Sequence, residues 1–178
     1  MVHIIHDGGG ENLSVSQIQN GLDHLNANIN GQAHNFLTLP TPDIFAAVRG
    51  DLNVEFRLAK KDPLGNPTSG IVRVRSELTI ATVTPTLSRN RVKALSYWNS
   101  YQYLNIWVVK SMPAGPDPIA DPALNGYAQF PWSGRMSTDG VMIRSAVFAV
   151  GETITHETGH WLGLCHTWDC GGGSCGSD

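Results

Sequence analysis

Three features are scarce in this 178-residue sequence: charge, cysteine and long apolar runs. The formal net charge is −3 and no basic cluster is present, so the sequence favours neither nucleic acid nor a membrane surface as a partner. No run of about 18 apolar residues occurs, which predicts that no segment spans a membrane. The first residues also lack the basic and apolar regions of a signal peptide.

Cysteine is confined to one short stretch near the C-terminal end. Cys165, Cys170 and Cys175 lie within 11 residues, and neither a C-x-x-C spacing nor a second pair indicates a structural zinc site. The odd number leaves at least one thiol unpaired within the chain. At 178 residues with 41% hydrophobic residues, the chain is long and apolar enough to form one domain with a real core.

The most informative stretch is residues 154–166, which reads ITHETGHWLGLCH. If residues 152–162 are helical, His156 and His160 lie one turn apart on one face and can hold a single metal ion. Glu157 lies beside that face, which suits a base that takes a proton from metal-bound water. A chance match on an amphipathic helix is the alternative, but five positions with defined geometric roles disfavour it.

A third ligand depends on a turn at Gly163. Glycine tolerates the left-handed conformation that ends helices, so a turn there can return His166 toward the other two histidines. Three imidazoles with one open position are expected of catalytic zinc, whereas structural zinc has four protein ligands. Cys165 is a competing ligand, but neighbouring residues on a tight turn rarely reach the same ion, so we favour His166.

The remaining patterns predict an α/β fold. Residues 14–29 have apolar residues at helical spacing, and Ser14 with Gln17 forms a capping box. Strands are predicted at 2–6, 54–59, 71–75, 78–83, 103–109 and 140–143, and short helices at 43–49 and 89–97. His3 and His6 are three residues apart on the first strand and so point to opposite faces, which indicates structural roles.

Two of these strands have distinct places in the sheet. Residues 103–109 are apolar on both faces, which is typical of a central strand with helices on both sides. Tyr127, Ala128, Gln129 and Phe130 form a predicted edge strand that could pair with an extended peptide through backbone hydrogen bonds. The alternative is an ordinary sheet edge that ends at Pro131.

The segments VHIIH, YLNIWVV, GYAQFPW, STDGVMI and GHWLGLCHTW follow one another over nearly the whole chain. Together with HETGHWLGLCH they resemble the pappalysin family in the metzincin clan of metallopeptidases. The resemblance implies a zincin-like twisted mixed five-stranded sheet with a backing helix and an active-site helix. It also implies a zinc endopeptidase that hydrolyses internal peptide bonds. His156, His160 and His166 would bind Zn²⁺, Glu157 would be the general base and acid, and residues 127–130 would line the upper rim of the cleft.

The resemblance further implies a longer, secreted protein that acts on protein or peptide substrates. Metzincins carry a methionine-containing turn downstream of the third histidine, and none of the four methionines can occupy it. We therefore expect residues 1–178 to be a single domain, the upper part of a catalytic domain truncated before that turn. Any Ca²⁺ site and the partners of Cys170 and Cys175 would lie downstream. The alternative function is a non-catalytic zinc-containing binding fragment.

Overall fold

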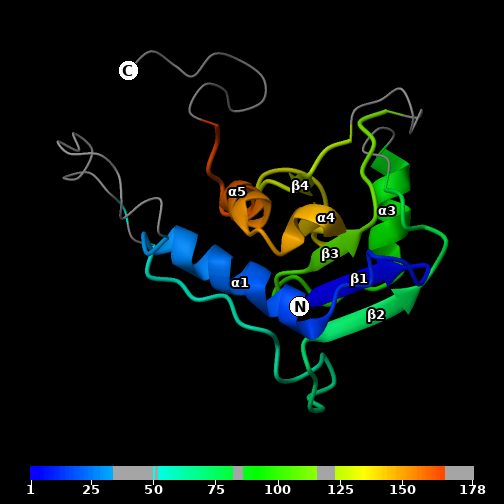
Figure 1. Cartoon of the computed structure of the whole chain (residues 1–178), viewed down its shortest axis with the longest axis horizontal. Helices are drawn as coiled ribbons and strands as arrows, with labels where there is room; N and C mark the ends of the chain where they lie inside the picture. Colours follow the sequence, from blue (N-terminus) through cyan, green and yellow to red (C-terminus); the bar gives the residue numbers. More distant parts are fainter. Residues whose placement is uncertain (34–49, 51, 82–85, 116–122, 167–178) are drawn as a thin grey trace.

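A computed structural model describes residues 1–33, 50, 52–81, 86–115 and 123–166 (Figure 1). Its strands are β1 (Val2–His6), β2 (Ile71–Arg75), β3 (Ile106–Val109), β4 (Gly126–Ala128) and β5 (Val141–Arg144). Its helices are α1 (Val15–Ile29), α3 (Thr86–Ala94), α4 (Ser145–Phe148) and α5 (Glu152–Trp161), with a 3-10 turn η2 (Met136–Thr138).

The strands form one sheet in the order β2-β1-β3-β5-β4. The first four strands are parallel, whereas β4 runs antiparallel to β5 at the edge. These observations confirm the predicted α/β fold with a mixed five-stranded sheet and an edge strand near residue 127. They also place β1 and β3 in the interior, and all four residues of β3 are buried, as predicted for a central strand.

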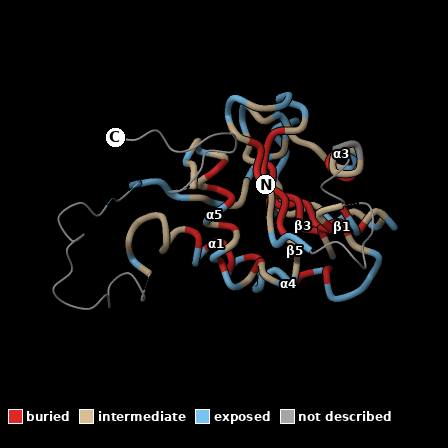
Figure 2. Tube along the Cα trace, turned by 90° about the horizontal axis from the view of Figure 1, so that it is seen from above, coloured by how far each residue is buried: buried red, intermediate tan, exposed pale blue. Residues whose placement is uncertain are grey.

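Alternate residues of the strands face two separate cores, because successive side chains of a strand point to opposite sides. One core contacts α1, α4 and α5 and includes Val2, Ile4, Ile106, Val108, Val141 and Ile143. The other lies toward α3 and includes Ile5, Trp107, Val109 and Met142. Figure 2 shows the strands between α3 on one side and α1 with α4 on the other. Helices therefore cover both faces of the sheet.

Helix α1 begins at the predicted capping box and supports α5. The Ser14 hydroxyl accepts a hydrogen bond from the Gln17 amide N–H at 3.2 Å, and the Gln17 side chain accepts one from the Ser14 N–H at 2.9 Å. Along the helix, the Asn28 side chain donates to the Thr155 hydroxyl of α5 at 3.0 Å. Helix α1 is therefore the backing helix that was predicted, and it holds α5 from the side of the first core.

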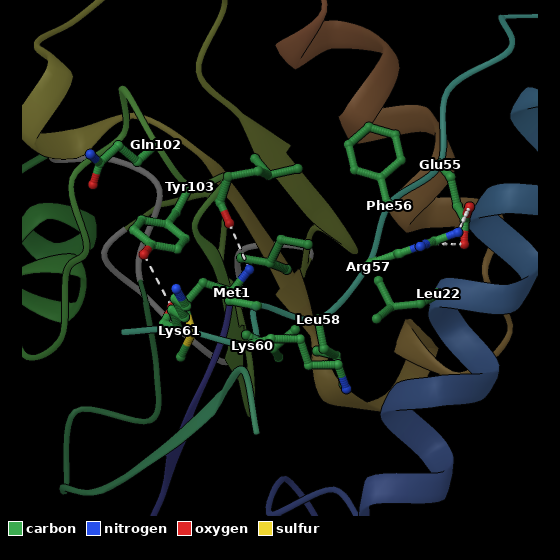
Figure 3. A pocket seen from close by; sticks show the side chains of 14 residues that line it. Met1, Leu22, Glu55, Phe56, Arg57, Leu58, Lys60, Lys61, Gln102 and Tyr103 are labelled. Carbon is green, nitrogen blue, oxygen red and sulfur yellow. Dashed lines mark hydrogen bonds and ion pairs between the residues drawn. The ribbon is translucent and has the colours of Figure 1, made fainter. Parts of the chain in front are cut away.

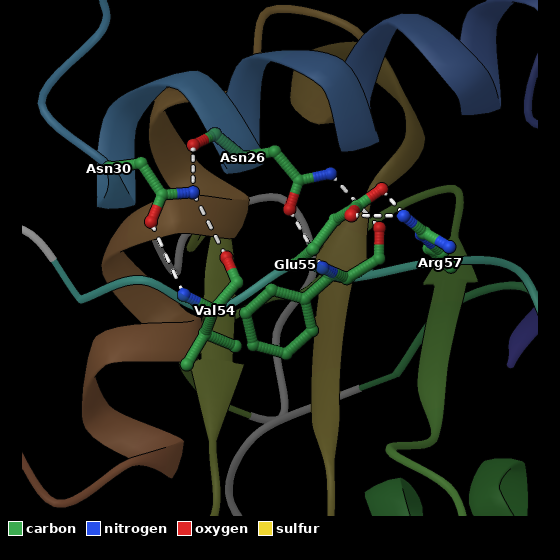
Figure 4. Close-up of polar contacts among 6 residues, drawn as sticks. Asn26, Asn30, Val54, Glu55 and Arg57 are labelled. Carbon is green, nitrogen blue, oxygen red and sulfur yellow. Dashed lines mark hydrogen bonds and ion pairs between the residues drawn. The ribbon is translucent and has the colours of Figure 1, made fainter.

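The strand predicted at residues 54–59 is wrong, because α1 side chains take the place of a neighbouring strand (Figure 4). The Asn26 amide accepts from the Phe56 N–H at 2.8 Å and donates to the Phe56 carbonyl at 2.9 Å. The Asn30 amide bonds both backbone groups of Val54 in the same way, at 3.3 and 2.9 Å. The extended segment satisfies its backbone here without joining the sheet.

Other predicted boundaries shift by a few residues or lie outside the described part. Residues 78–81 form no strand, since Ile80 makes only an isolated bridge to Ser111, and residues 82–83 are outside the described range. The helix predicted at 89–97 spans Thr86–Ala94, and the helix predicted at 43–49 is outside the described residues. The strand predicted at 103–109 begins only at Ile106.

His3 has the structural role that its position on β1 indicated. The ring is fully buried and stacks on Trp107, with ring centroids 5.3 Å apart. Its Nδ1 lies 2.6 Å from the Ser96 hydroxyl and its Nε2 lies 2.9 Å from Oδ1 of Asn105. Burial lowers the pKa of His3 to about 4, which keeps the imidazole neutral at physiological pH.

A cavity of about 360 Å³ lies between α1, residues 55–61 and the beginning of β1 and β3 (Figure 3). The amino group of Met1 donates to the Leu104 carbonyl at 3.0 Å, and the Tyr103 hydroxyl donates to the Lys61 carbonyl at 3.1 Å. Glu55 and Arg57 form an ion pair with each other. In each of these contacts the polar groups are paired within the protein, so none of the contacts indicates a catalytic or ligand-binding role for this cavity.

Candidate metal centre

Helix α5 places two histidines on one face. His156 and His160 are four residues apart within Glu152–Trp161, and their Nε2 atoms are 2.9 Å apart. The helix begins after Gly151, whose positive φ of 86° is accessible to glycine and which packs directly against His24 of α1. His24 therefore has a scaffold role in seating the start of this helix.

The turn predicted at Gly163 is present and has a regular hydrogen-bonding pattern. Gly163 has φ of 94°, its N–H donates to the His160 carbonyl at 2.9 Å, and the Leu164 N–H donates to the Gly159 carbonyl at 2.9 Å. These two bonds define a Schellman motif, the usual glycine-terminated end of a helix. The motif reverses the chain and brings His166 back toward α5.

The three histidines meet at their Nε2 atoms. Nε2 of His166 lies 3.1 Å from Nε2 of His156 and 3.1 Å from Nε2 of His160. Tetrahedral ligand nitrogens held about 2.0–2.1 Å from one ion would be separated by roughly 3.3–3.4 Å, which is a few tenths of an ångström more than the three distances between these nitrogen atoms. Within the described residues this is the one cluster with metal-ligand geometry. The three side chains therefore fit a metal ion.

A backbone carbonyl controls the tautomer of His160. The Nδ1 of His160 lies 2.7 Å from the Leu164 carbonyl oxygen, which can only accept, so Nδ1 carries the proton. In the neutral ring Nε2 then has a lone pair directed at His156 and His166. Because the Leu164 carbonyl belongs to the Schellman turn, one turn both returns His166 and orients His160.

Glu157 is buried beside this cluster. Its side chain is 8% exposed, and burial raises the pKa of the carboxyl to about 7, with the Ala128 N–H as a hydrogen-bond donor that opposes the rise. A hollow of about 410 Å³ reaches both Glu157 and His156, and a second of about 300 Å³ contacts all three histidines. The carboxyl group can therefore exchange protons near neutral pH at a surface open to a ligand.

Gly126 is a site residue that sequence reasoning missed. A Cβ atom at Gly126 would lie 2.5 Å from Cγ and 2.8 Å from Oε1 of Glu157, so the carboxylate side chain occupies the space of the absent side chain. The signal available in the sequence was a glycine directly before the predicted edge strand, since glycine in a strand often marks a close approach of another group. Gly126 therefore allows Glu157 to pack against the sheet edge.

The edge strand predicted at 127–130 is shifted, because β4 spans Gly126–Ala128 and residues 129–130 continue beyond its end. The predicted substrate residues divide between the two faces of β4 and of this continuation. Ala128 belongs to the core beside α5, and the Phe130 ring lies 5.0 Å from the His160 ring. Tyr127 packs with the opposite core, and the Gln129 side chain bonds to Thr138 and Arg135 away from the histidines. Only Ala128 and Phe130 therefore lie on the metal side of the strand.

Trp132 and Cys165 complete the surroundings. Trp132 is 65% exposed and stacks on Phe130 at 4.9 Å, so an aromatic pair stands beside His160. Cys165 is bonded in a disulfide, and its partner lies outside the described residues. Its sulfur therefore offers no thiolate to a metal ion, which supports the choice of His166 over Cys165 as the third ligand.

A mixed sheet that carries a helix with a three-histidine cluster beside a buried glutamate is an arrangement typical of metallopeptidases. Solved structures agree. Mature mirolysin of Tannerella forsythia, in complex with a cleaved peptide, superposes with a TM-score of 0.78 at 34% identity, over 99% of this chain and 66% of that chain. A promirolysin mutant of the same organism superposes at 0.77, over 58% of its chain.

Proteins with similar sequences are also named as metalloproteases. An extracellular metalloprotease of Verticillium alfalfae is 41% identical over 92 residues, which is 44% of this chain and 29% of the relative. An extracellular metalloprotease of Arthroderma otae is 26% identical over 186 aligned residues, which is 98% of this chain and 53% of the relative. No family model matches. The chain thus spans about half or less of these relatives' length, and they support a metallopeptidase family.

Among the described residues, no helix is long and apolar enough to cross a membrane.

Proposed function

We propose that this chain carries the catalytic zinc centre of a secreted endopeptidase. The observation that carries this proposal is the convergence of three imidazole Nε2 atoms, no more than 3.1 Å apart, beside the buried carboxyl group of Glu157. Secretion is supported by relatives that are named extracellular metalloproteases. The pappalysin type within the metzincins is part of the proposal and rests on the motifs.

His156, His160 and His166 would hold the ion, and the fixed tautomer of His160 prepares one of the three lone pairs. A zinc ion in this place would supply Lewis-acid activation of water and of the scissile carbonyl. Glu157 would act as the general base that accepts a proton and later delivers it to the leaving amine. Burial raises the pKa of Glu157 to about 7 in the protein without the ion, and the positive charge of a bound zinc ion would lower it, so the carboxylate form would be available to accept the proton.

The edge strand β4 would hold the substrate backbone. Because β4 is last in the sheet order, an extended peptide can add beside it through backbone hydrogen bonds, independent of the peptide's side chains. Tyr127, Ala128, Gln129 and Phe130 are the proposed contact residues. A protein or peptide substrate is supported by mirolysin, whose structure was solved with a cleaved peptide.

We also propose that residues 1–178 form the upper subdomain of one catalytic domain. Helix α5, which carries His156 and His160, would lie at the bottom of this subdomain, below the substrate cleft. The match to 66% of the mirolysin chain supports this division. Any Ca²⁺ site belongs to the remaining part of such a domain.

The decisive experiment separates metal binding from proton transfer. Glu157→Gln should retain one equivalent of zinc and lose at least about 10²-fold in cleavage of a quenched peptide library, since general-base catalysis contributes that much. Glu77→Gln is the matched control, because Glu77 is exposed and lies on a loop after β2. Glu157→Gln activity equal to that of Glu77→Gln would exclude Glu157 as the base.

The same experiment tests the alternative function. A non-catalytic zinc-containing fragment would bind zinc in the unaltered chain but cleave no member of the library, with or without Glu157. Zinc retention without cleavage, both in this chain and in a chain extended through the remaining part of the proposed catalytic domain, would therefore replace the peptidase proposal by a binding role.

A further inference from the structure

A second hollow lies on the opposite face of β4 from the histidines. It has a volume of about 400 Å³ and lies between α3, β4 and the segment that leads into and includes η2. Its lining includes Arg89, Asn90, Tyr127, Gln129, Arg135 and Ser137. The proposed peptidase chemistry uses none of the charged groups in this pocket.

Two cations of α3 contact the same aromatic ring. The guanidinium of Arg89 lies 4.0 Å from the Tyr127 ring centroid, and the ammonium of Lys93 lies 5.3 Å from it. Lys93 is 2% exposed, lies 5.1 Å from the Trp107 ring, and donates a hydrogen bond to the Thr138 carbonyl. Two positively charged side chains of α3 therefore lie at the face of β4 that carries Tyr127.

Among the described residues around this pocket, positive charge exceeds negative charge. Arg89, Lys93 and Arg135 are opposed by Asp139, whose buried carboxylate accepts from the indole N–H of Trp161 with both oxygens at 3.2 Å. Burial, followed by repulsion from Arg89, lowers the pKa of Lys93 to about 7 despite the attraction of Asp139. An added carboxylate would reduce this repulsion.

The polar wall of the pocket is held in place by its own contacts. The Thr138 hydroxyl donates to Oε1 of Gln129 at 2.8 Å, and Nε2 of Gln129 donates to the Arg135 carbonyl at 3.1 Å. A Cβ atom at Gly134 would lie 2.5 Å from the Gln129 side chain, so this turn closes tightly around it. Arg135 is thus carried by a turn anchored to β4, while its own side chain is exposed.

The position of the pocket decides which part of a peptide can reach it. A peptide paired along β4 presents alternate side chains to opposite faces of the sheet. One set would face the histidines, as Ala128 and Phe130 do, and the other would face α3, as Tyr127 and Gln129 do. Residues of the second set would project over the basic pocket.

We propose that the pocket formed by Arg89, Tyr127, Gln129 and Arg135 is a subsite for an acidic side chain of the substrate peptide. The inference rests on the proposed peptidase function and on substrate pairing along β4. An aspartate or glutamate at one of the α3-facing positions would bind beside the two guanidinium groups. Lysine and arginine at that position would be disfavoured by like charge.

The test uses peptides of one cleavable sequence in which Glu or Gln occupies each position in turn. We expect kcat/KM to be roughly three- to tenfold higher for Glu at a position that faces α3, as for a partly exposed charge pair, and unchanged at its direct neighbours. Arg135→Gln should bring the Glu-to-Gln ratio close to one, and Arg135→Lys should restore part of it. Arg89→Gln provides a second variant in case one substitution disturbs the turn.

Arg91→Gln is the matched control. Arg91 lies on the same helix but is exposed and does not line the pocket, so its loss should leave the Glu-to-Gln ratio unchanged. A ratio near one at every position, or a ratio that survives both Arg135→Gln and Arg89→Gln, would overturn the subsite.

A binding measurement keeps this result distinct from failure of the peptidase proposal. If no peptide is cleaved, fluorescence anisotropy of labelled Glu and Gln peptides decides the subsite by itself. Tighter binding of the Glu peptide that Arg135→Gln abolishes would support the subsite, and equal binding of both peptides would refute it.

Discussion

Two buried histidines of this molecule, His3 and His160, differ in the partners of their ring nitrogens. His3 has partners at both ring nitrogens, the Ser96 hydroxyl and the Asn105 amide, and its ring is fully buried. His160 has a protein partner at Nδ1 alone that fixes its tautomer, while Nε2 points at two other imidazole nitrogens. A histidine whose second ring nitrogen lies close to other potential ligand atoms is placed to bind a metal ion. A buried histidine with hydrogen-bond partners at both ring nitrogens instead has a structural role in the core.

The largest expected effect comes from replacing His160, the proposed metal ligand of this pair. His160→Ala should weaken zinc binding by more than about 10²-fold, because loss of a group that only orients a ligand already costs 10- to 100-fold. Zinc should raise the melting temperature of the unaltered chain but not of this variant. His3→Ala is the counterpart, in which zinc should still raise the melting temperature of the folded fraction. Equal zinc affinity in His160→Ala and the unaltered chain would contradict the three-histidine assignment.

A smaller effect is expected at Gly126, the glycine that accommodates the side chain of the proposed base Glu157. Gly126→Ala should displace the Glu157 side chain, since the new methyl group would lie 2.5 Å from its Cγ. We expect kcat to fall on the order of 10²-fold, as for a misplaced catalytic group, with zinc affinity nearly unchanged. Gly10→Ala is a suitable control, because a Cβ atom there meets nothing within 4 Å. Full activity of Gly126→Ala would show that Glu157 has room to move.

A third effect, confined to acid pH, is the contribution of His3 to stability. Burial lowers the folded-state pKa of His3 from 6.5 to about 4, so between these values the unfolded chain binds a proton that the folded chain does not. This contribution is fully present above about pH 6.5 and is lost as the pH falls toward 4, by on the order of 3 kcal/mol.

Urea unfolding of the unaltered chain and of His3→Gln, measured from pH 7 to 4, isolates this contribution as the difference in slope. All other ionisable groups are the same in both proteins, so their contributions cancel in the comparison. Parallel stability curves over this range would mean that His3 is not the titrating group.

Local sequence was sufficient for the elements whose patterns are periodic or capped. Helix α1, the buried strand β3 and the active-site helix follow from apolar spacing, a capping box and the HExxH geometry. The segment 54–59 shows where such reasoning fails. Its alternating pattern is that of a strand, but the Asn26 and Asn30 amides satisfy the backbone groups that would otherwise form a ladder.

The sequence by itself determined the chemical types at the site: three imidazoles at helix-and-turn spacing, a carboxylate next to the first, and a glycine that permits the left-handed turn. Only the tertiary structure determined that β4 is the strand that packs against α5 beside these side chains. The burial that raises the pKa of Glu157, the close approach of Gly126 and the division of residues 127–130 between two faces all arise from packing β4 against α5. These are contacts between segments about 30 residues apart, and their geometry depends on how the sheet and helix meet, which no local pattern encodes.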